Sequence, residues 1–226
     1  MATRSKRYQL ARKAVDPARR YSLPEAVSLL KTFPAAKFTE TVELSVRLGI
    51  DPRQSDQMVR GSVSLPHGIG KEVRVIAFCE GSKAAEAREA GAIEAGGEEL
   101  VKKIEAGWTD FDVAVAEPAM MRHVGKLGRI LGPQGKMPSP KSGTVTPDVV
   151  RAVKEFKAGR VEYRADNTGN LHVPVGRADF DEQKLVENVE AILSHIQAAR
   201  PPSVKGVFIR SAHLSLTMSP SVRLAV

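Results

Sequence analysis

The sequence predicts a mixed α+β and α/β fold, in which one α+β domain, built from both ends of the chain, is interrupted by an inserted α/β domain. Towards both ends of the 226-residue chain, apolar and polar residues alternate, as in half-buried antiparallel strands. In the middle, almost continuously apolar strands alternate with helices, which is typical of a parallel sheet covered on both faces.

The N-terminal part opens with a capping box, in which Ser22 begins a helix over 22–33 and Glu25 takes its third position. Strict alternation then predicts a half-buried strand over 41–48. A second alternating run over 59–65 ends in a Pro-His-Gly turn.

The middle part follows a different pattern. Apolar strands are predicted over 73–78 and 111–117, and two short helices between them, over 82–90 and 98–106, are each closed by a glycine. A further helix is predicted to begin at Thr146-Pro147 and to stop at Gly159.

The C-terminal part alternates again. Runs 161–164 and 171–175 flank the turn sequence Asp-Asn-Thr-Gly at 166–169, which indicates an antiparallel hairpin. Asp179 and Glu182 form a predicted capping box for a long helix, and the last strand covers 207–217.

The changes of pattern define the expected domains. The two connections fall near 66–70 and 158–160, and both contain glycine, as hinges often do. We therefore expect a discontinuous α+β domain of residues 1–67 and 160–226, and an inserted α/β domain of residues 68–159.

Composition excludes several classes of protein. No apolar run approaches the ~18–20 residues of a membrane helix, and no apolar segment follows the basic N-terminus, so we expect neither a membrane partner nor a secretory signal. A single cysteine, Cys79, leaves no disulfide framework or cysteine metal knuckle, and a cytoplasmic location is expected.

The net charge of +8 favours a polyanionic partner. It is unevenly distributed: residues 1–20 carry seven Lys or Arg against one Asp, and residues 71–117 carry six basic against eleven acidic side chains. Residues 118–147 hold no acid and five cations, which form an expected secondary basic surface: Arg122, Lys126, Arg129, Lys136 and Lys141.

Signatures of catalysis are weak. The run GRILGPQGK (128–136) fails the P-loop pattern because Ile130 and Met137 stand where it needs Gly and Ser or Thr. The five histidines show no metal-ligand spacing, and no catalytic constellation or cofactor motif is present. A phosphate-ester-binding enzyme that uses loop 125–141 remains an alternative, since its four glycines could bring backbone N–H groups close to phosphates.

A second candidate surface lies around Phe38. Its ring could stack on an unpaired base, with Lys37 on phosphate and Glu40 accepting from a base amino group, or it could be buried in the core. The polar face of strand 207–217 offers short donors and acceptors suited to RNA, or is an ordinary solvent face: Ser211, His213, Ser215 and Thr217.

Five segments, in order, carry a resemblance over essentially the whole chain. They are KFTETVE (37–43), DPRQSDQMVRGSVSLPHGIGK (51–71), GKLGRILGPQGKMPSPKSGTV (125–145), KAGRVEYRADNTGNLH (157–172) and TMSPSVR (217–223). They resemble the L1 family of bacterial large-subunit ribosomal proteins. One departure is Ser219, where the family has Gly in TMGPS. Because Pro220 favours extended dihedrals at 219, small size is the expected reason for that glycine.

The resemblance implies a split two-layer α+β RNA-binding domain and an inserted three-layer, Rossmann-like domain without a nucleotide. It implies binding to large-subunit ribosomal RNA at the mobile stalk, release of exit-site tRNA, and repression of translation through the protein's own operon mRNA. It also implies a ribosome-associated protein, monomeric off the ribosome, that is no enzyme and needs no cofactor or metal. A free-standing RNA-binding regulator is the alternative.

By the same match, the residues expected to bind RNA lie in three parts of the sequence. The match gives Lys37, Phe38, Thr39, Glu40, Asp166, Thr168, Ser211, Thr217 and Met218, and the neighbouring Thr41, Gly169, His172 and Ser219 complete the expected set.

Overall fold

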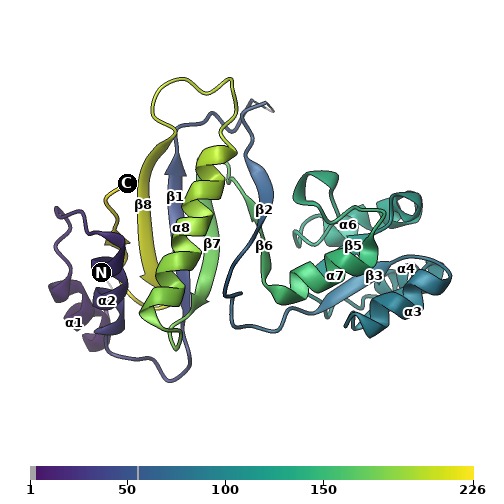
Figure 1. Cartoon of the computed structure of the whole chain (residues 1–226), viewed down its shortest axis with the longest axis horizontal. Coiled ribbons are helices and arrows are strands. Elements are labelled where there is room, and N and C mark those ends of the chain that lie inside the picture. The colour runs from purple at the N-terminus through teal and green to yellow at the C-terminus, as the bar shows by residue number, and fades with distance from the viewer. Residues whose placement is uncertain (1–3, 55) are drawn as a thin grey trace. The chain divides into compact units, whose positions relative to one another are not determined.

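The computed structural model describes residues 4–54 and 56–226, and shows a mixed α/β fold of helices and several sheets (Figure 1). The chain's own contacts divide it into two compact units. Unit 1 runs to Gly70 and resumes at Val161, and unit 2 is Lys71–Arg160. Each unit has its own hydrophobic core, so each is described by itself.

Unit 1 is built around a four-stranded antiparallel sheet, with a separate strand pair and three helices. Its elements are α1 (Lys6–Ala14), α2 (Leu23–Lys31), β1 (Thr41–Leu48), β2 (Arg60–Ser64), β6 (Arg160–Arg164), β7 (Asn170–Arg177), α8 (Glu182–Ala198), β8 (Ile209–Leu216) and β9 (Val222–Arg223).

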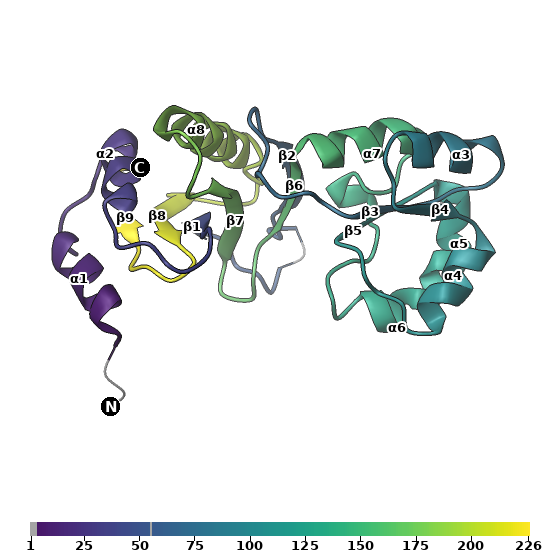
Figure 2. The same ribbon diagram turned by 90° about the horizontal axis from the view of Figure 1, so that it is seen from below.

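The sheet order is β7-β1-β8-β9, so β1 is paired along both edges. The predicted alternation of β1 is confirmed, because Val42, Leu44, Val46 and Leu48 are all buried. Their face of the sheet is covered by α2 and α8, which contact each other and the strands (Figure 2). The opposite face carries the polar residues of the same strands.

The helices of unit 1 follow their local signals with one correction. The capping box of Ser22 and Glu25 is present at α2. The predicted box of Asp179 and Glu182 is wrong: α8 begins at Glu182 with Asp181 as N-cap, because Asp179 lies in the turn after β7. The predicted long helix is present, and its apolar stripe packs on the sheet through Leu185, Val189, Ile192 and Ile196.

The predicted hairpin of runs 161–164 and 171–175 is wrong. The two strands do not pair with each other: β6 pairs with β2, and β7 pairs with β1. The turn at 166–169 forms, but only pairing with β1 places the apolar face of β7 under α8. The turn residues therefore predict correctly that the chain reverses at 166–169, but they do not predict which strands pair.

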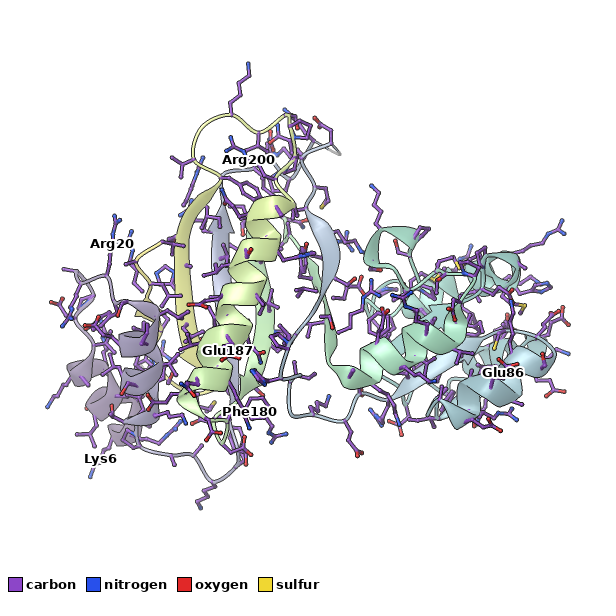
Figure 3. The ribbon with its side chains drawn as sticks, in the orientation of Figure 1. Lys6, Arg20, Glu86, Phe180, Glu187 and Arg200 are labelled. Atoms are coloured by element: carbon purple, nitrogen blue, oxygen red, sulfur yellow. The ribbon has the colours of Figure 1, made fainter. Side chains whose placement is uncertain are left out.

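No helix was predicted in residues 1–20, yet α1 forms there. Ser5 caps it by accepting a hydrogen bond from the Tyr8 N–H, and Ala11 is its buried residue. Only a single small residue faces the core, so apolar periodicity gives almost no signal for this helix. Figure 3 labels Lys6, the first residue of α1, and Arg20, the last cation of the basic segment that contains this helix.

Unit 2 has a three-stranded parallel sheet in the order β4-β3-β5. Alternate residues of β3 enter two different cores: Ile76 and Phe78 join α4–α6, whereas Val75 and Ala77 join α3 and α7. Helices therefore cover both faces. The elements are β3 (Val75–Phe78), α3 (Ser82–Glu89), β4 (Glu94–Gly96), α4 (Glu98–Glu105), β5 (Val113–Ala116), α5 (Met121–Val124), α6 (Gly128–Leu131) and α7 (Val149–Ala158).

Three details of unit 2 differ from the sequence interpretation. Strand β4 was not predicted, since three residues with one buried side chain give no period. Helix α7 begins after its N-cap Asp148, which accepts from the Arg151 N–H, and not at Thr146-Pro147. Residues 118–141, whose Gly and Pro content predicts an irregular loop, instead form a series of short helical turns that includes α5 and α6.

We expect the side chain of Asn188 to contribute strongly to the stability of unit 1. This fully buried side chain donates to the Val175 and Gly68 carbonyls at 2.8 and 3.0 Å and accepts from the His67 N–H at 3.2 Å. Asn188→Ala leaves these backbone groups unpaired and should cost about 2–3 kcal/mol in urea unfolding. Glu190→Ala, exposed on the same helix, should cost less than about 0.5 kcal/mol. Equal stability of the two variants would contradict this role.

Candidate nucleic-acid interface

The expected RNA-binding residues of unit 1 lie at the two ends of the sheet and across its uncovered face. Register explains the arrangement: Thr41 of β1 is opposite Arg177, and Arg47 at the other end is opposite Asn170 and Ser211. Segments 37–41 and 217–219 therefore meet at one end of the sheet, and the turn 166–169 lies at the other. His172 lies between them, opposite Ser45.

Backbone hydrogen bonds join the two loops at the first end. The Thr217 N–H donates to the Thr41 carbonyl at 3.1 Å, and the Thr41 N–H donates to Thr217 Oγ1 at 3.0 Å. The Thr217 hydroxyl is thus already bonded within the protein, and the two loops are held side by side. Segments separated by 176 residues form a single surface.

Two large apolar side chains protrude from these joined loops. Phe38 and Met218 are each 54% exposed. The alternative that Phe38 is a core residue is therefore wrong. Burying such side chains against a partner is favourable by about 25 cal/mol per Å², so two of them on adjoining loops point to a contact surface.

Glu40 lies beneath this surface and not on it. Its side chain is 4% exposed, Oε1 accepts from the Met218 N–H at 2.9 Å, and Oε2 lies 3.6 Å from Arg7 Nη1. This geometry does not favour the interpretation that Glu40 accepts a hydrogen bond from a base amino group. The carboxylate holds the Met218 loop in place instead.

Ser219 also turns its hydroxyl inward. Ser219 Oγ accepts from the Leu216 N–H at 2.9 Å and donates to the Pro220 carbonyl at 2.9 Å. None of the described non-glycine residues has a positive φ, so position 219 does not need the backbone freedom of glycine. The added hydroxyl fastens the turn that carries Thr217 and Met218.

The turn at the other end is organised by Asp166. Its Oδ1 accepts from the N–H of Asn170 at 2.7 Å and from the N–H and hydroxyl of Thr168 at 2.8 Å each. Partial burial opposes ionisation, but these hydrogen bonds prevail and lower the pKa of Asp166 to about 2. Gly169 is needed here because its φ is +81°. In this structure, Asp166, Thr168 and Gly169 stabilise the conformation of the turn.

A polar cluster occupies the middle of the uncovered face. His172 Nδ1 lies 3.0 Å from Glu43 Oε1 and 3.2 Å from Ser45 Oγ. Ser, His and Glu together suggest a catalytic triad, but both contacts use the same ring nitrogen, whereas a triad needs both. Nearby, burial and then the positive charge of Arg223 lower the pKa of His213, which leaves a neutral ring at pH 7.

The expected secondary basic surface belongs to unit 2. Arg122, Lys126, Arg129 and Lys141 are exposed. Lys136 differs, because its Nζ donates to the Thr109 carbonyl at 2.9 Å and lies 5.1 Å from the centre of the Phe111 ring. Four cations of this surface are therefore exposed, and the fifth, Lys136, also makes a hydrogen bond within unit 2.

The idea that glycines of this segment present N–H groups to phosphate is wrong. The N–H groups of Gly125, Gly128, Gly132 and Gly135 all donate to backbone carbonyls within the short helical turns. The geometry of a phosphate-binding loop is thus absent from the part of the chain that carried the enzyme alternative.

Several residues of the interface were missed by sequence reasoning. Glu43 and Ser45 share the polar parity of β1, which was a signal available from alternation. Arg7, which binds the Met218 carbonyl, and Arg177, which binds the Thr39 carbonyl, had no such signal. Their roles depend on contacts between distant segments.

Other chemistry is not indicated by the described residues. Residues 4–54 and 56–226 contain no group of three or more His, Cys, Asp or Glu side chains that could hold a metal ion. Among the same residues, no helix is long and apolar enough to cross a membrane. Cys79 is buried, and burial raises the pKa of its thiol, which disfavours the reactive thiolate.

The uncovered face of unit 1 is polar along its length and carries exposed apolar side chains at one end, which are features of a contact surface. The model of the Ribosomal protein L1p/L10e family matches residues 30–220. Two similar relatives are named "Large ribosomal subunit protein uL1": one from Kosmotoga olearia, 54% identical, and one from Thermosipho melanesiensis, 53% identical. Each alignment covers 99% of this chain and 97% of the relative. The chain belongs to the ribosomal protein L1p/L10e family, which is not a family of enzymes.

We expect the Asp166 turn to make stability depend on acid. A carboxyl with a lowered pKa stabilises the fold above its unfolded pKa, and this contribution is lost as pH falls from about 4 towards 2. Asp166→Asn should therefore unfold more easily than the parent by about 1–2 kcal/mol at pH 6, with a difference that shrinks towards pH 2. Urea unfolding across this range measures it. The exposed Asp179→Asn serves as control, and a pH-independent difference would refute the assignment.

Proposed function

We propose that the chain, a ribosomal protein of the large subunit, binds large-subunit ribosomal RNA through the uncovered sheet face and the joined loops of unit 1. The observation that carries this proposal is the pair of exposed side chains, Phe38 and Met218, on two loops locked together beside a polar surface. Aromatic side chains stack on unpaired bases, and hydroxyl and amide groups suit the 2′-OH and phosphate.

The charge distribution supports the same conclusion. The basic segment 4–20 contacts the joined loops through Arg7, which brings additional cations to this end of unit 1. Phosphate neutralisation contributes affinity that falls with salt, by roughly 0.7–0.9 in the log–log slope per contact. Affinity would therefore come from electrostatics, and specificity from the folded shape of the RNA and a few stacked bases.

The two units would divide the work. In this proposal, unit 1 is the discontinuous RNA-binding domain and unit 2 is the inserted domain, which presents the secondary basic surface of Arg122, Lys126, Arg129 and Lys141. We further propose that the protein acts at the mobile stalk, assists release of exit-site tRNA, and represses its own operon mRNA by the same surface. These finer roles follow the family resemblance.

Co-sedimentation distinguishes ribosomal assembly from a free-standing regulator. We expect the protein to remain with purified large subunits through a moderate salt wash, because a structural constituent makes many contacts at once. A regulator that binds only its messenger would stay in the supernatant. Absence of the protein from the ribosomal pellet at low salt would refute the proposal.

Phe38→Ala tests the RNA surface directly. We expect a loss of about 1–3 kcal/mol in affinity for large-subunit ribosomal RNA, measured by filter binding, because a stacked base loses its platform. The unfolding free energy should change by less than about 0.5 kcal/mol, since Phe38 is exposed.

The matched control is Ile93→Ala, an exposed apolar residue of unit 2 that should leave RNA affinity unchanged. If Phe38→Ala binds RNA as tightly as Ile93→Ala does, the joined loops are not at the RNA surface.

A further inference from the structure

Residues 35–39, which include Phe38, border a cavity of about 530 Å³. The cavity is lined by α2, the beginning of α8 and β1, through apolar residues that include Val27, Leu30, Val42 and Leu185. A segment beside such a space gains little packing from beneath, because dispersion contacts need atoms within about 4 Å. Its position therefore depends on polar contacts.

Several of these contacts converge on one side chain from a different part of the chain. Arg7 of α1 donates from Nη1 to the Pro34 carbonyl at 3.2 Å and from Nη2 to the Met218 carbonyl at 3.0 Å. Nη1 also lies 3.6 Å from Oε2 of the buried Glu40. One guanidinium thus holds the beginning of the Phe38 loop, the carboxylate at its end, and the Met218 loop.

We propose that Arg7 is a positioning residue for RNA binding, which fixes the Phe38 and Met218 loops in their binding conformation without contacting RNA itself. This inference rests on the proposed function. It separates Arg7 from the other cations of segment 4–20, which are mostly exposed, whereas the Arg7 side chain is 27% exposed with its guanidinium directed at protein carbonyls.

The physical reason is preorganisation. Loops that must be ordered on binding lose affinity, at about 0.5–1.5 kcal/mol per immobilised side chain. The planar fork of arginine can reach two carbonyls and a carboxylate at once, whereas a lysine ammonium is a point charge that cannot match this geometry. Loss of Arg7 would also leave the Glu40 carboxylate buried without its ion pair.

The experiment compares Arg7→Lys, Arg7→Ala and Arg12→Ala in the full chain. Arg12 is exposed on the same helix and controls for charge. Affinity for purified large-subunit ribosomal RNA is measured as a function of salt, at temperatures well below the melting point of each variant. Hydrogen exchange of the Met218 N–H, which is bonded to Glu40, is measured without RNA.

If Arg7 is a positioning residue, Arg7→Lys should weaken RNA binding at least tenfold although the charge is kept. Arg7→Ala should leave the dependence of RNA affinity on salt concentration unchanged. Hydrogen exchange of the Met218 N–H should accelerate at least tenfold in both Arg7 variants. Arg12→Ala should change affinity less than threefold. Near-parental affinity in Arg7→Lys, or a slope reduced by about 0.7–0.9 in Arg7→Ala, would show a direct phosphate contact and overturn the inference.

Hydrogen exchange keeps the two proposals distinguishable. If the parent protein fails to bind RNA, the proposed function is wrong, whatever the variants do. If it binds RNA and Met218 exchange is unchanged in both Arg7 variants, the positioning role alone is refuted. A merely structural role of Arg7 would instead lower the melting temperature without altering RNA affinity in the folded protein.

Discussion

The pairing of β1 along both of its edges is the constraint on which the rest of unit 1 depends. β7 and β8 come from the far end of the chain, and each is aligned with β1 by main-chain hydrogen bonds. Burial of alternate apolar residues fixes that register, since a shift of one residue would turn them to solvent. The register in turn sets Thr41 beside Thr217 and places Asp166 at the opposite end. The pairing of the strands thus determines which side chains come together at the candidate interface.

Within that frame, the interface residues divide into two kinds. Phe38 and Met218 face outward and are available to a partner. Glu40, Asp166 and Ser219 use their polar atoms on neighbouring backbone groups, which defines the shape of the loops. Replacing such a carboxylate would leave the N–H groups that it accepts from without their partner. Residues of the candidate interface can thus contribute by fixing the shape of its loops.

Much of this could be read from the sequence. Strict alternation predicted β1 and the buried face of β8, and the Ser22–Glu25 pair predicted α2, because these signals are local. The hairpin of β6 and β7 was predicted wrongly, and the burial of Glu40 was not foreseen, because strand pairing and the packing around Glu40 are decided by contacts between segments that are distant in the sequence, such as the hydrogen bond from the Met218 N–H to Glu40. The five long motifs indicated which residues form the interface, but not which of them face outward.

The split of unit 1 also sets an order of events during synthesis. β1 is complete at residue 48, but its first partner strand starts at residue 170 and the last loop of the interface ends at 219. At about 5–20 residues per second, the nascent strand waits roughly 6–25 s for its first partner. Unit 2, which lies between them in the chain, can form its core in that interval. Because Thr217 and Met218 are synthesised long after Thr41, the joined loops can exist only in chains whose translation has passed residue 218.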